Sequence, residues 1–249
     1  MLPPRPLQGL LELAEQALRT WEPCWSGFLA AELREQACTE LETLSELAVA
    51  SDGGWPQAER RRLLLCRREL LDSAPAAPLQ GLRLSGNFLF DPAEPADVLA
   101  ALQAAGALPE EIGDIWIRGD RGAQLVLCPQ AAQRLDGLTI VVRTVEAQLQ
   151  ATAVAELQLP SERIPKALSS VEASLRLDAV ASAGFGLSRN RMAELIRTGA
   201  VRINWHPVSS PSKELRQGDR VQLAGRGELA ILEVQPTKRE RWRLRMERR

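Results

Sequence analysis

Residues 186–205 read GLSRNRMAELIRTGAVRINW, and their pattern predicts a short helix that leads into a strand. Ser188 can cap this helix, apolar side chains recur at helical spacing, and Gly199 can end it. Arg189 and Arg191 fall in the first turn, where the helix dipole is already positive and a cation costs about a few tenths of a kcal/mol. The sequence therefore raises the question of which negative group compensates the charge at this helix end.

The bulk composition is that of a folded protein without a membrane span or metal site. The 249 residues are 45% hydrophobic and 25% charged, which suits two or three domains with apolar cores. No apolar run approaches the ~18 residues of a membrane helix, and the N-terminus has no secretory signal pattern. Four scattered cysteines and a single histidine argue against a zinc site or a disulfide framework. We therefore expect a cytoplasmic protein without a cofactor.

The net charge of −1 hides an uneven distribution along the chain. Residues 174–249 contain 16 Lys and Arg against 8 Asp and Glu, a balance of +8. The first 173 residues contain 15 against 24, a balance of −9. A basic C-terminal domain on an otherwise acidic chain indicates that this domain meets a polyanion, although chance clustering on a solvated surface is the alternative.

The N-terminal segment, residues 1–75, is expected to be a helical domain. Apolar residues recur at helical spacing in 7–21 and 28–47, and Pro56 can begin a third helix over 56–72. That third segment carries a basic cluster, which we interpret as a solvated helix face because residues 1–75 are net acidic; its members are Arg60, Arg61, Arg62, Arg67 and Arg68.

A linker at 73–78, SAPAAP, precedes a middle domain over residues 76–158. Its segments predict the order βαββαβ, which is the ferredoxin-like arrangement. They are the strand 82–90, the helix 95–106, the strands 112–119 and 123–129, the helix 129–137 and one final strand over 138–149.

RNA-recognition motifs share this topology and stack bases on aromatic residues of the third strand. Here the third strand contains Leu125, Val126 and Leu127 and no aromatic residue. We therefore expect this domain to serve packing or partner docking rather than base recognition.

Residues 158–173 read as a polar connection, and the basic domain follows over 174–249. A short helix over 175–184 precedes the helix of the opening stretch, and strands are expected at 201–204, 221–225 and 228–234.

Two sets of arginines in this domain are suited to phosphate. A helix N-terminus presents unpaired N–H groups and a positive dipole end, so a docked phosphate would compensate the charge of Arg189 and Arg191. In the tail, TKRERWRLRMERR (237–249), alternation along a strand places Arg241, Arg243 and Arg245 on one face with no acid between them. A solvated strand face is the alternative to a polyanion contact.

These residues resemble the alpha-L RNA-binding motif, the module named after ribosomal protein S4. The resemblance rests on Arg-Leu-Asp at 176–178, Ser-Arg at 188–189, Val-Arg-Ile-Asn at 201–204 and Gly-Asp at 218–219. In that family two short helices and the following loop form one RNA-binding face, which implies roles for the matching residues Arg176, Ser188, Arg189, Arg202 and Asn204. Members commonly have Gly after the Asn, where the turn needs a positive φ; here Trp205 leaves open whether the turn forms, and whether the indole stacks on a base or packs internally.

The whole chain is similar to the YlmH-type bacterial proteins, whose cyanobacterial and plastid members are called photosystem II S4-domain proteins. The stretches that carry this similarity are TWEPCWSGFL (20–29), GGWPQAERRRLLL (53–65), EIGDIWIRG (111–119) and the run that begins SLRLDAVASAGFGLSR (174–189). The resemblance implies RNA binding at the ribosome, a role in rescuing stalled large subunits in some bacterial relatives, and a link to photosystem II biogenesis.

No enzyme reading is favoured. Pseudouridine synthases use the Asp of an Arg-Leu-Asp motif, but Asp178 is followed by Ala-Val-Ala-Ser-Ala-Gly inside the binding module, and an ion pair with a neighbouring Arg is the simpler role. The GRG at 225–227 lies between strands and fits a turn rather than a methyltransferase cofactor loop. His206, the single histidine, follows a tryptophan in a basic loop, where an RNA contact or a solvated side chain is favoured over a catalytic role.

The sequence thus predicts a non-catalytic protein that binds structured RNA, rRNA or tRNA, at the large ribosomal subunit. The alternative is an assembly factor for a protein complex such as photosystem II, in which the acidic N-terminal and middle domains bind the protein partner. The candidate RNA-binding residues are Arg176, Asp178, Ser188, Arg189, Arg191, Arg197, Arg202, Asn204, Trp205, His206, Lys213, Arg241, Arg243 and Arg245.

Overall fold

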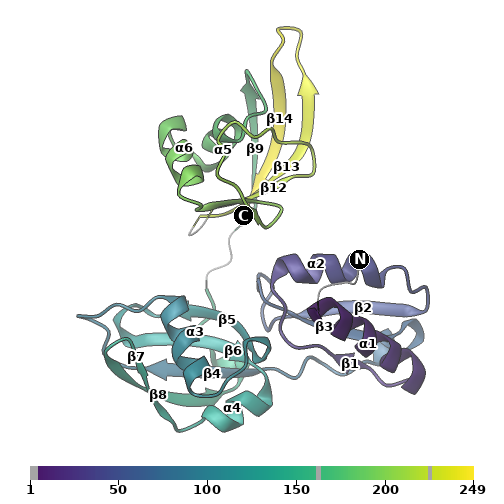
Figure 1. The fold of residues 1–249 in the computed structure, drawn as a ribbon, viewed down its shortest axis with the longest axis vertical. Helices are drawn as coiled ribbons and strands as arrows, with labels where there is room; N and C mark the ends of the chain where they lie inside the picture. Colours follow the sequence, from purple (N-terminus) through teal and green to yellow (C-terminus); the bar gives the residue numbers. More distant parts are fainter. Residues whose placement is uncertain (1–4, 161–163, 224–225) are drawn as a thin grey trace. The chain divides into compact units, whose positions relative to one another are not determined.

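The computed structural model describes residues 5–160, 164–223 and 226–249. The chain divides after Pro160 into two compact units (Figure 1). Both units combine helices with sheet, so the expected α+β class is confirmed. Among the residues described, no helix is long and apolar enough to cross a membrane.

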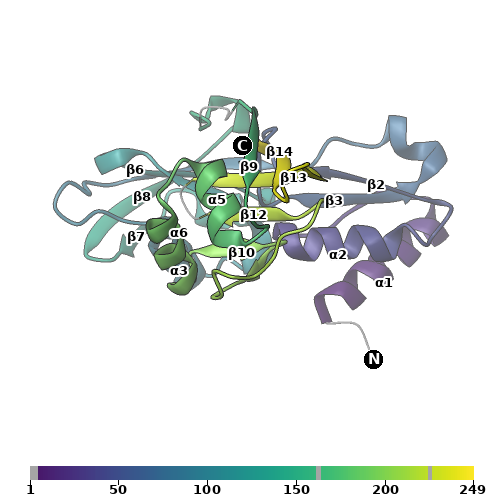
Figure 2. The same cartoon turned by 90° about the horizontal axis from the view of Figure 1, so that it is seen from above.

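The first unit begins with two helices and a small antiparallel sheet. Helices α1 (Arg5–Thr20) and α2 (Ala31–Leu41) lie on the same side of strands β1 (Cys24–Trp25), β2 (Leu47–Asp52) and β3 (Arg62–Arg67), which pair in the order β1-β3-β2 (Figure 2). Helix α1 buries every third or fourth residue, as an amphipathic helix does. The core between α1 and β3 contains Leu7, Leu10, Ala14, Ala17, Leu63 and Leu65.

The helix predicted over 56–72 is wrong. Its centre is the strand β3, and a short 3-10 segment, η1 (Arg68–Ser73), follows. The run Leu63–Cys66 is buried on both faces of the sheet, since Leu63 and Leu65 face the helices while Leu64 and Cys66 pack on the opposite side. A continuous apolar run has no periodicity, so the sequence alone could not separate a buried strand from a helix.

Arg60 and Arg62 of this segment are structural rather than members of a solvated helix face, whereas Arg68 is exposed. Arg60 donates to the carbonyl oxygens of Ile112 (2.7 Å) and Pro109 (2.6 Å). Arg62 is itself buried and donates to the carbonyl oxygens of Ser26 (2.6 Å) and Pro78 (2.7 Å). Desolvation by burial lowers the pKa of both guanidinium groups from the usual arginine value. The two side chains therefore link backbone segments inside the first unit.

The middle part of the first unit has the expected ferredoxin-like order with one strand added. Its sheet runs β5-β6-β4-β8-β7 and is antiparallel throughout. The segment predicted as one final strand is a hairpin, because Arg143 at φ 57° reverses the chain between β7 and β8. The elements are β4 (Gln80–Ser85), α3 (Pro95–Ala104), η2 (Pro109–Glu111), β5 (Ile112–Ile117), η3 (Gly119–Arg121), β6 (Gly122–Leu127), α4 (Pro129–Leu135), β7 (Thr139–Val142), β8 (Val145–Thr152) and η4 (Val154–Glu156).

One face of this sheet is covered by helices, and the other is covered in part, since Val141 of β7 and Gln148 of β8 are exposed there. Helices α3 and α4 pack on one face, and on the other Val126 is fully buried against Phe28 from the loop between β1 and α2. Gly113 permits this contact, since a Cβ there would lie 2.7 Å from a ring carbon of Phe28. The position of Val126 on the third strand is thus occupied by packing within the unit and is not open to a base.

The second unit places two helices on a six-stranded antiparallel sheet of order β11-β10-β12-β13-β14-β9. Helices α5 (Leu177–Phe185) and α6 (Arg189–Arg197) share a core with the sheet that includes Phe185, Met192 and Leu244. The strands are β9 (Lys166–Glu172), β10 (Val201–Ile203), β11 (His206–Pro207), β12 (Arg220–Leu223), β13 (Gly227–Pro236) and β14 (Trp242–Arg248).

The expectation of a polar connection over 158–173 is wrong for residues 166–172. They form strand β9, which pairs along the whole of β14, from Trp242↔Glu172 to Arg248↔Lys166. Residues 161–163, in the same connection, and residues 224–225, at the end of the strand predicted over 221–225 and the start of the GRG turn, lie outside the described residues. The C-terminal unit therefore includes a strand that precedes the predicted range 174–249.

Candidate RNA-binding surface

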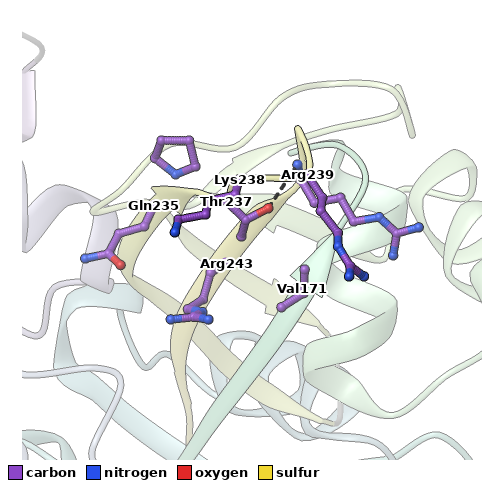
Figure 3. A pocket seen from close by; sticks show the side chains of 8 residues that line it. Val171, Gln235, Thr237, Lys238, Arg239 and Arg243 are labelled. Carbon is purple, nitrogen blue, oxygen red and sulfur yellow. Dashed lines mark hydrogen bonds between the residues drawn. The ribbon is translucent and has the colours of Figure 1, made fainter.

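The tail arginines lie at the end of the β13–β14 hairpin. Along β14 the side chains of Leu244 and Met246 enter the core, while Arg243 and Arg245 are exposed on the other face, as the alternation predicted. Arg241 precedes the strand and, with Arg243, lines a surface depression (Figure 3). This arginine face of β14 also contacts an acid, because Arg245 pairs with Glu233 of β13 at 3.2 Å.

Helix α6 has the cap that the sequence predicted. The Ser188 hydroxyl accepts a hydrogen bond from the backbone N–H of Arg191 at 3.3 Å, and Gly199 follows the helix with φ 78°. Arg189 and Arg191 are both exposed in the first turn, and Arg197 is exposed in the last. The side chain of Arg191 pairs with Glu194 at 2.6 Å. The second of the two first-turn cations is therefore compensated within the helix itself.

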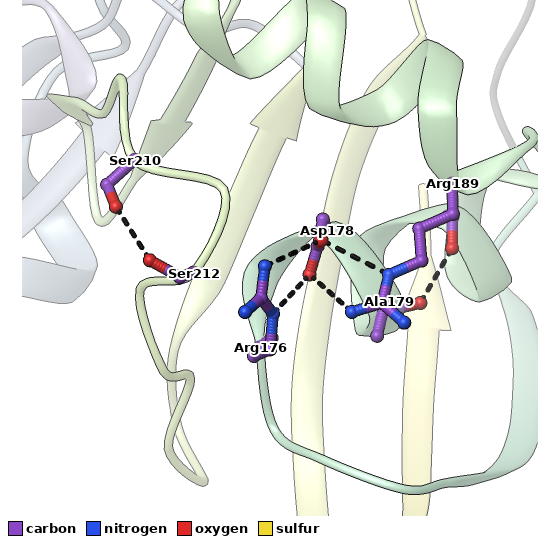
Figure 4. Close-up of polar contacts among 7 residues, drawn as sticks. Arg176, Asp178, Ala179, Arg189, Ser210 and Ser212 are labelled. Atoms are coloured by element: carbon purple, nitrogen blue, oxygen red, sulfur yellow. Dashed lines mark hydrogen bonds and ion pairs between the residues drawn. The ribbon is translucent and has the colours of Figure 1, made fainter.

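The first of those cations, Arg189, is compensated by Asp178 of α5 (Figure 4). Arg189 donates through Nε and Nη2 to the two carboxylate oxygens of Asp178, at 3.1 and 3.2 Å. Arg176 donates to the same two oxygens, at 3.0 Å each. We call these three residues the arginine clamp. The ion pair expected for Asp178 is confirmed, and it joins the start of α5 to the start of α6.

The clamp fixes two guanidinium groups on one buried carboxylate. The Asp178 side chain is 7% exposed, whereas those of Arg176 and Arg189 are 40% and 54% exposed. Burial by itself raises the pKa of Asp178, but the hydrogen bonds and charges of Arg176 and Arg189 outweigh it and lower the pKa below the usual aspartate range. The bond to Asp178 raises the pKa of Arg176. Two cations on one anion leave a net positive charge, and both arginine side chains remain partly exposed.

The loop before β12 reaches the start of α5. The backbone N–H groups of Leu177 and Asp178 donate to the carbonyl oxygens of Lys213 (2.7 Å) and Pro211 (3.0 Å), and Ser210 and Ser212 hydrogen-bond each other beside the clamp (Figure 4). These bonds satisfy N–H groups that would otherwise be unpaired at a helix N-terminus. They also place Lys213, whose side chain is exposed, next in space to the clamp.

The tight turn that Trp205 left in doubt does form. Asn204 and Trp205 connect β10 to β11 with φ values of 49° and 70°, which is the pattern of a type I′ hairpin turn. The Asn204 amide donates to Asp219 at 2.8 Å and its oxygen accepts from the backbone N–H of Arg220 at 2.9 Å. Asn204 therefore ties two turns together, and both ends of its side chain are occupied.

Trp205 packs inside the C-terminal unit. Its indole is half-buried, its ring centroid lies 5.5 Å from the guanidinium carbon of Arg220, and its backbone N–H donates to Gln222 at 3.2 Å. The indole N–H is buried and has no hydrogen-bond partner among the residues that the structure describes. An aromatic residue at positive φ costs about 1–2 kcal/mol, so the site holds a strained residue with an unsatisfied donor.

Trp205→Gly compares the backbone strain at this position with the stabilisation that the packed indole contributes. Glycine removes the backbone strain of about 1–2 kcal/mol, while loss of the half-buried ring and of its contact with Arg220 costs a similar amount. We expect the free energy of unfolding to change by less than about 1 kcal/mol in chemical denaturation. A loss above roughly 2 kcal/mol would show that the indole is a core residue whose packing dominates the strain.

The structure divides the candidate residues into three groups. Arg176, Asp178, Ser188 and Arg189 come together at the clamp, with Arg191 and Lys213 beside them and Arg197 at the far end of α6. Arg202, Asn204, Trp205 and His206 occupy the β10–β11 hairpin, where Arg202 and His206 are exposed. The tail arginines form the third group. Lys238 and Arg239 also line the depression and were missed, because they lie in a turn outside the strand alternation.

Two further kinds of chemistry can be compared with the described part of the chain: a nucleophile at Asp178 and a metal site. Both oxygens of Asp178 are held by guanidinium groups, which is unsuitable for a nucleophile. Within the described residues, no group of three or more His, Cys, Asp or Glu could hold a metal ion.

Two family models match the chain. Residues 6–70 match the model of the YlmH N-terminal domain, and residues 175–221 match the S4 domain. A curated relative from Bacillus subtilis (strain 168), "Ribosome-associated protein quality control protein P2", is 26% identical over 217 residues, which span 86% of this chain and 84% of the relative. A solved structure, "Cell division protein ylmH from Streptococcus pneumoniae", is 16% identical, covers 63% of this chain and 96% of that chain, and has a TM-score of 0.44. The chain therefore carries the YlmH-type N-terminal domain and an S4 domain, and the resemblance to that family is confirmed.

Proposed function

We propose that this protein is a non-catalytic, cytoplasmic RNA-binding protein that associates with the ribosome and binds structured rRNA or tRNA, with the large subunit as its partner. The arginine clamp is the observation that carries the proposal. Its two guanidinium groups are held in fixed orientations by Asp178, and about half of each side chain is exposed. A guanidinium with free N–H groups is suited to bidentate contacts with phosphate oxygens.

Three further observations support this surface. Arg191 and Lys213 add exposed cations next to the clamp, and the C-terminal 76 residues have a net charge of +8 within an otherwise acidic chain. The S4 domain match covers the clamp and the β10–β11 hairpin. The Bacillus subtilis relative is named as a ribosome-associated quality control protein. Phosphate contacts of this kind position RNA without reading its sequence.

The proposal is tested by measuring the affinity of the full chain for rRNA and tRNA at several salt concentrations. Arg189→Ala is expected to weaken binding and to reduce the slope of log affinity against log salt by about one, because one phosphate contact is lost. The matched control is Arg121→Ala, which removes an exposed arginine from the first unit.

Equal affinities and equal slopes for the two variants would contradict the clamp as an RNA site. The same measurement addresses the alternative role as an assembly factor for a protein complex. In that case the salt slope of the unsubstituted protein would itself be small, since the acidic first unit rather than the clamp would carry the function.

A further inference from the structure

The end of the β13–β14 hairpin projects away from the rest of the C-terminal sheet. Strand β12 pairs only with the first part of β13, and its last partner is Ala230. Strand β13 continues to Pro236, so six residues at about 3.3 Å each carry the hairpin roughly 20 Å beyond that pair. There β9 flanks β14, with Glu172 opposite Trp242, and Figure 1 shows the hairpin extending past the helices of this unit.

A depression of about 750 Å³ lies at this projecting end (Figure 3). Gln235, Arg243 and Val171 form one row across the three strands β13, β14 and β9. Residues of this row alternate with Leu244, which packs beneath α5, so the row faces the side of the sheet that the helices leave open. The depression is lined by Val171, Gln235, Pro236, Thr237, Lys238, Arg239, Arg241 and Arg243.

The lining carries four cations and no carboxylate. Among the described residues, no acid pairs with Lys238, Arg239, Arg241 or Arg243. Glu240 belongs to the same turn but does not line the depression. Farther along the hairpin the cations are paired with acids: Arg245 pairs with Glu233, and Arg249 pairs with Glu247. The uncompensated charge is thus concentrated at the hairpin end rather than spread along β14.

The turn that carries these cations is held by its own backbone. The N–H of Thr237 donates to the carbonyl oxygen of Arg241 at 2.7 Å, and the Thr237 hydroxyl accepts from the N–H of Arg241 at 3.2 Å. The N–H of Glu240 also donates to the carbonyl oxygen of Thr237 at 3.2 Å. Because the turn is closed without ion pairs, the cationic groups stay available for a ligand.

We propose that this depression is a second phosphate-binding site, which holds a segment of RNA separate from the segment at the arginine clamp. The inference rests on the proposed function, since it takes RNA as the polyanion of this unit. Guanidinium and ammonium groups around an open, polar depression are suited to a phosphate backbone. The clamp belongs to the helices on one side of the sheet, whereas the depression lies on the open side. An RNA backbone segment on one side of the sheet contacts only one of the two sites, so RNA in which two backbone segments converge is the expected ligand.

The test uses the full chain and two RNA probes, a single stem-loop and a junction of two helices. Arg241→Ala/Arg243→Ala is expected to lower affinity for the junction about tenfold, to reduce its salt slope by about two, and to leave stem-loop affinity within about twofold. Arg249→Ala is the matched control, because Arg249 is exposed at the other end of the same hairpin but paired with Glu247. Thermal unfolding of each variant confirms that the fold is retained.

The outcomes separate this site from the clamp. Arg189→Ala is expected to weaken binding of both probes, whereas the hairpin double variant weakens only the junction. An unchanged junction affinity in the double variant, or a loss equal to that of Arg249→Ala, overturns the second site. If the double variant weakens the junction while Arg189→Ala changes neither probe, the clamp fails as an RNA site and the hairpin site stands.

Discussion

Asp178→Asn is expected to lower the free energy of unfolding of the C-terminal unit by about 2–3 kcal/mol, because hydrogen bonds between charged groups each contribute roughly 1.5–3 kcal/mol. The amide keeps the shape of the carboxylate but cannot accept from both Arg176 and Arg189 as the carboxylate does. For a unit of this size the loss corresponds to a drop in Tm of roughly 10 °C or more. Differential scanning calorimetry of the full chain measures it.

The matched control is Glu194→Gln. The Arg191–Glu194 pair is as short as 2.6 Å but joins two side chains that are 57% and 61% exposed. Exposed pairs contribute about 0–1 kcal/mol, so this variant should change stability by less than about 0.5 kcal/mol. Equal losses of unfolding free energy for the two substitutions would show that burial of the Asp178 carboxylate does not strengthen the clamp.

The clamp also predicts how stability depends on pH. The pKa of Asp178 is lowered in the folded state, so its contribution is complete above the ordinary aspartate pKa of about 3.9 and is lost as the pH falls through the folded-state pKa. The stability difference between the unsubstituted protein and Asp178→Asn should therefore be constant near neutral pH and narrow below about pH 4. A difference that persists unchanged at lower pH would argue against ionisation of Asp178 as the cause.

Asp114→Ala is expected to destabilise the first unit by about 3 kcal/mol, at roughly 1 kcal/mol for each hydrogen bond lost. The Asp114 carboxylate on β5 accepts from the Trp55 indole at 3.1 Å and from the backbone N–H groups of Glu59 and Arg60 at 2.9 Å each. These bonds attach the loop before β3 to the middle sheet. Chemical denaturation, with tryptophan fluorescence as the probe, measures the loss.

The control for this variant is Asp120→Ala, which removes an exposed carboxylate from the connection between β5 and β6 and should change stability by less than about 0.5 kcal/mol. Because Asp114 belongs to the first unit, RNA affinity of Asp114→Ala is expected to stay within about twofold of the unsubstituted protein at temperatures where it is folded. A large loss of RNA affinity would show that the first unit takes part in binding.

The elements that the sequence predicted well have a clear period and clear ends. Pro95 and Pro129 begin helices in the middle domain, and Ser188 and Gly199 bound α6. Strand β14 alternates strictly between buried and exposed side chains from Arg243 to Met246. In each case the local pattern agrees with the tertiary environment, which is the condition under which sequence reasoning succeeds.

Elements whose apolar residues do not recur at a regular spacing were missed. Leu63–Cys66 is apolar throughout, and β9 looks polar in the sequence because Lys166, Ser169, Ser170 and Glu172 make up most of it. Two-sided burial and strand pairing at long sequence separation leave no short-range signal.

Part of the candidate site could also not be predicted from the sequence. An ion pair of Asp178 with a neighbouring Arg could be expected, but its sharing between Arg176 and Arg189 depends on how α5 packs against α6. The same holds for Arg60 and Arg62, whose carbonyl partners lie on other segments. The sequence proposed an RNA phosphate as the counter-charge at the start of α6, whereas the protein supplies its own carboxylate.

Strand β9 also decides where the C-terminal unit can be cut. A fragment that begins at Ser174 would lack the strand that covers the outer edge of β14, and Leu168 would no longer pack against the core. An uncovered strand edge is a template for pairing with a second chain, so such a fragment would tend to aggregate. A fragment that begins before Lys166 keeps the edge of β14 paired and is the one we expect to fold without this exposed edge.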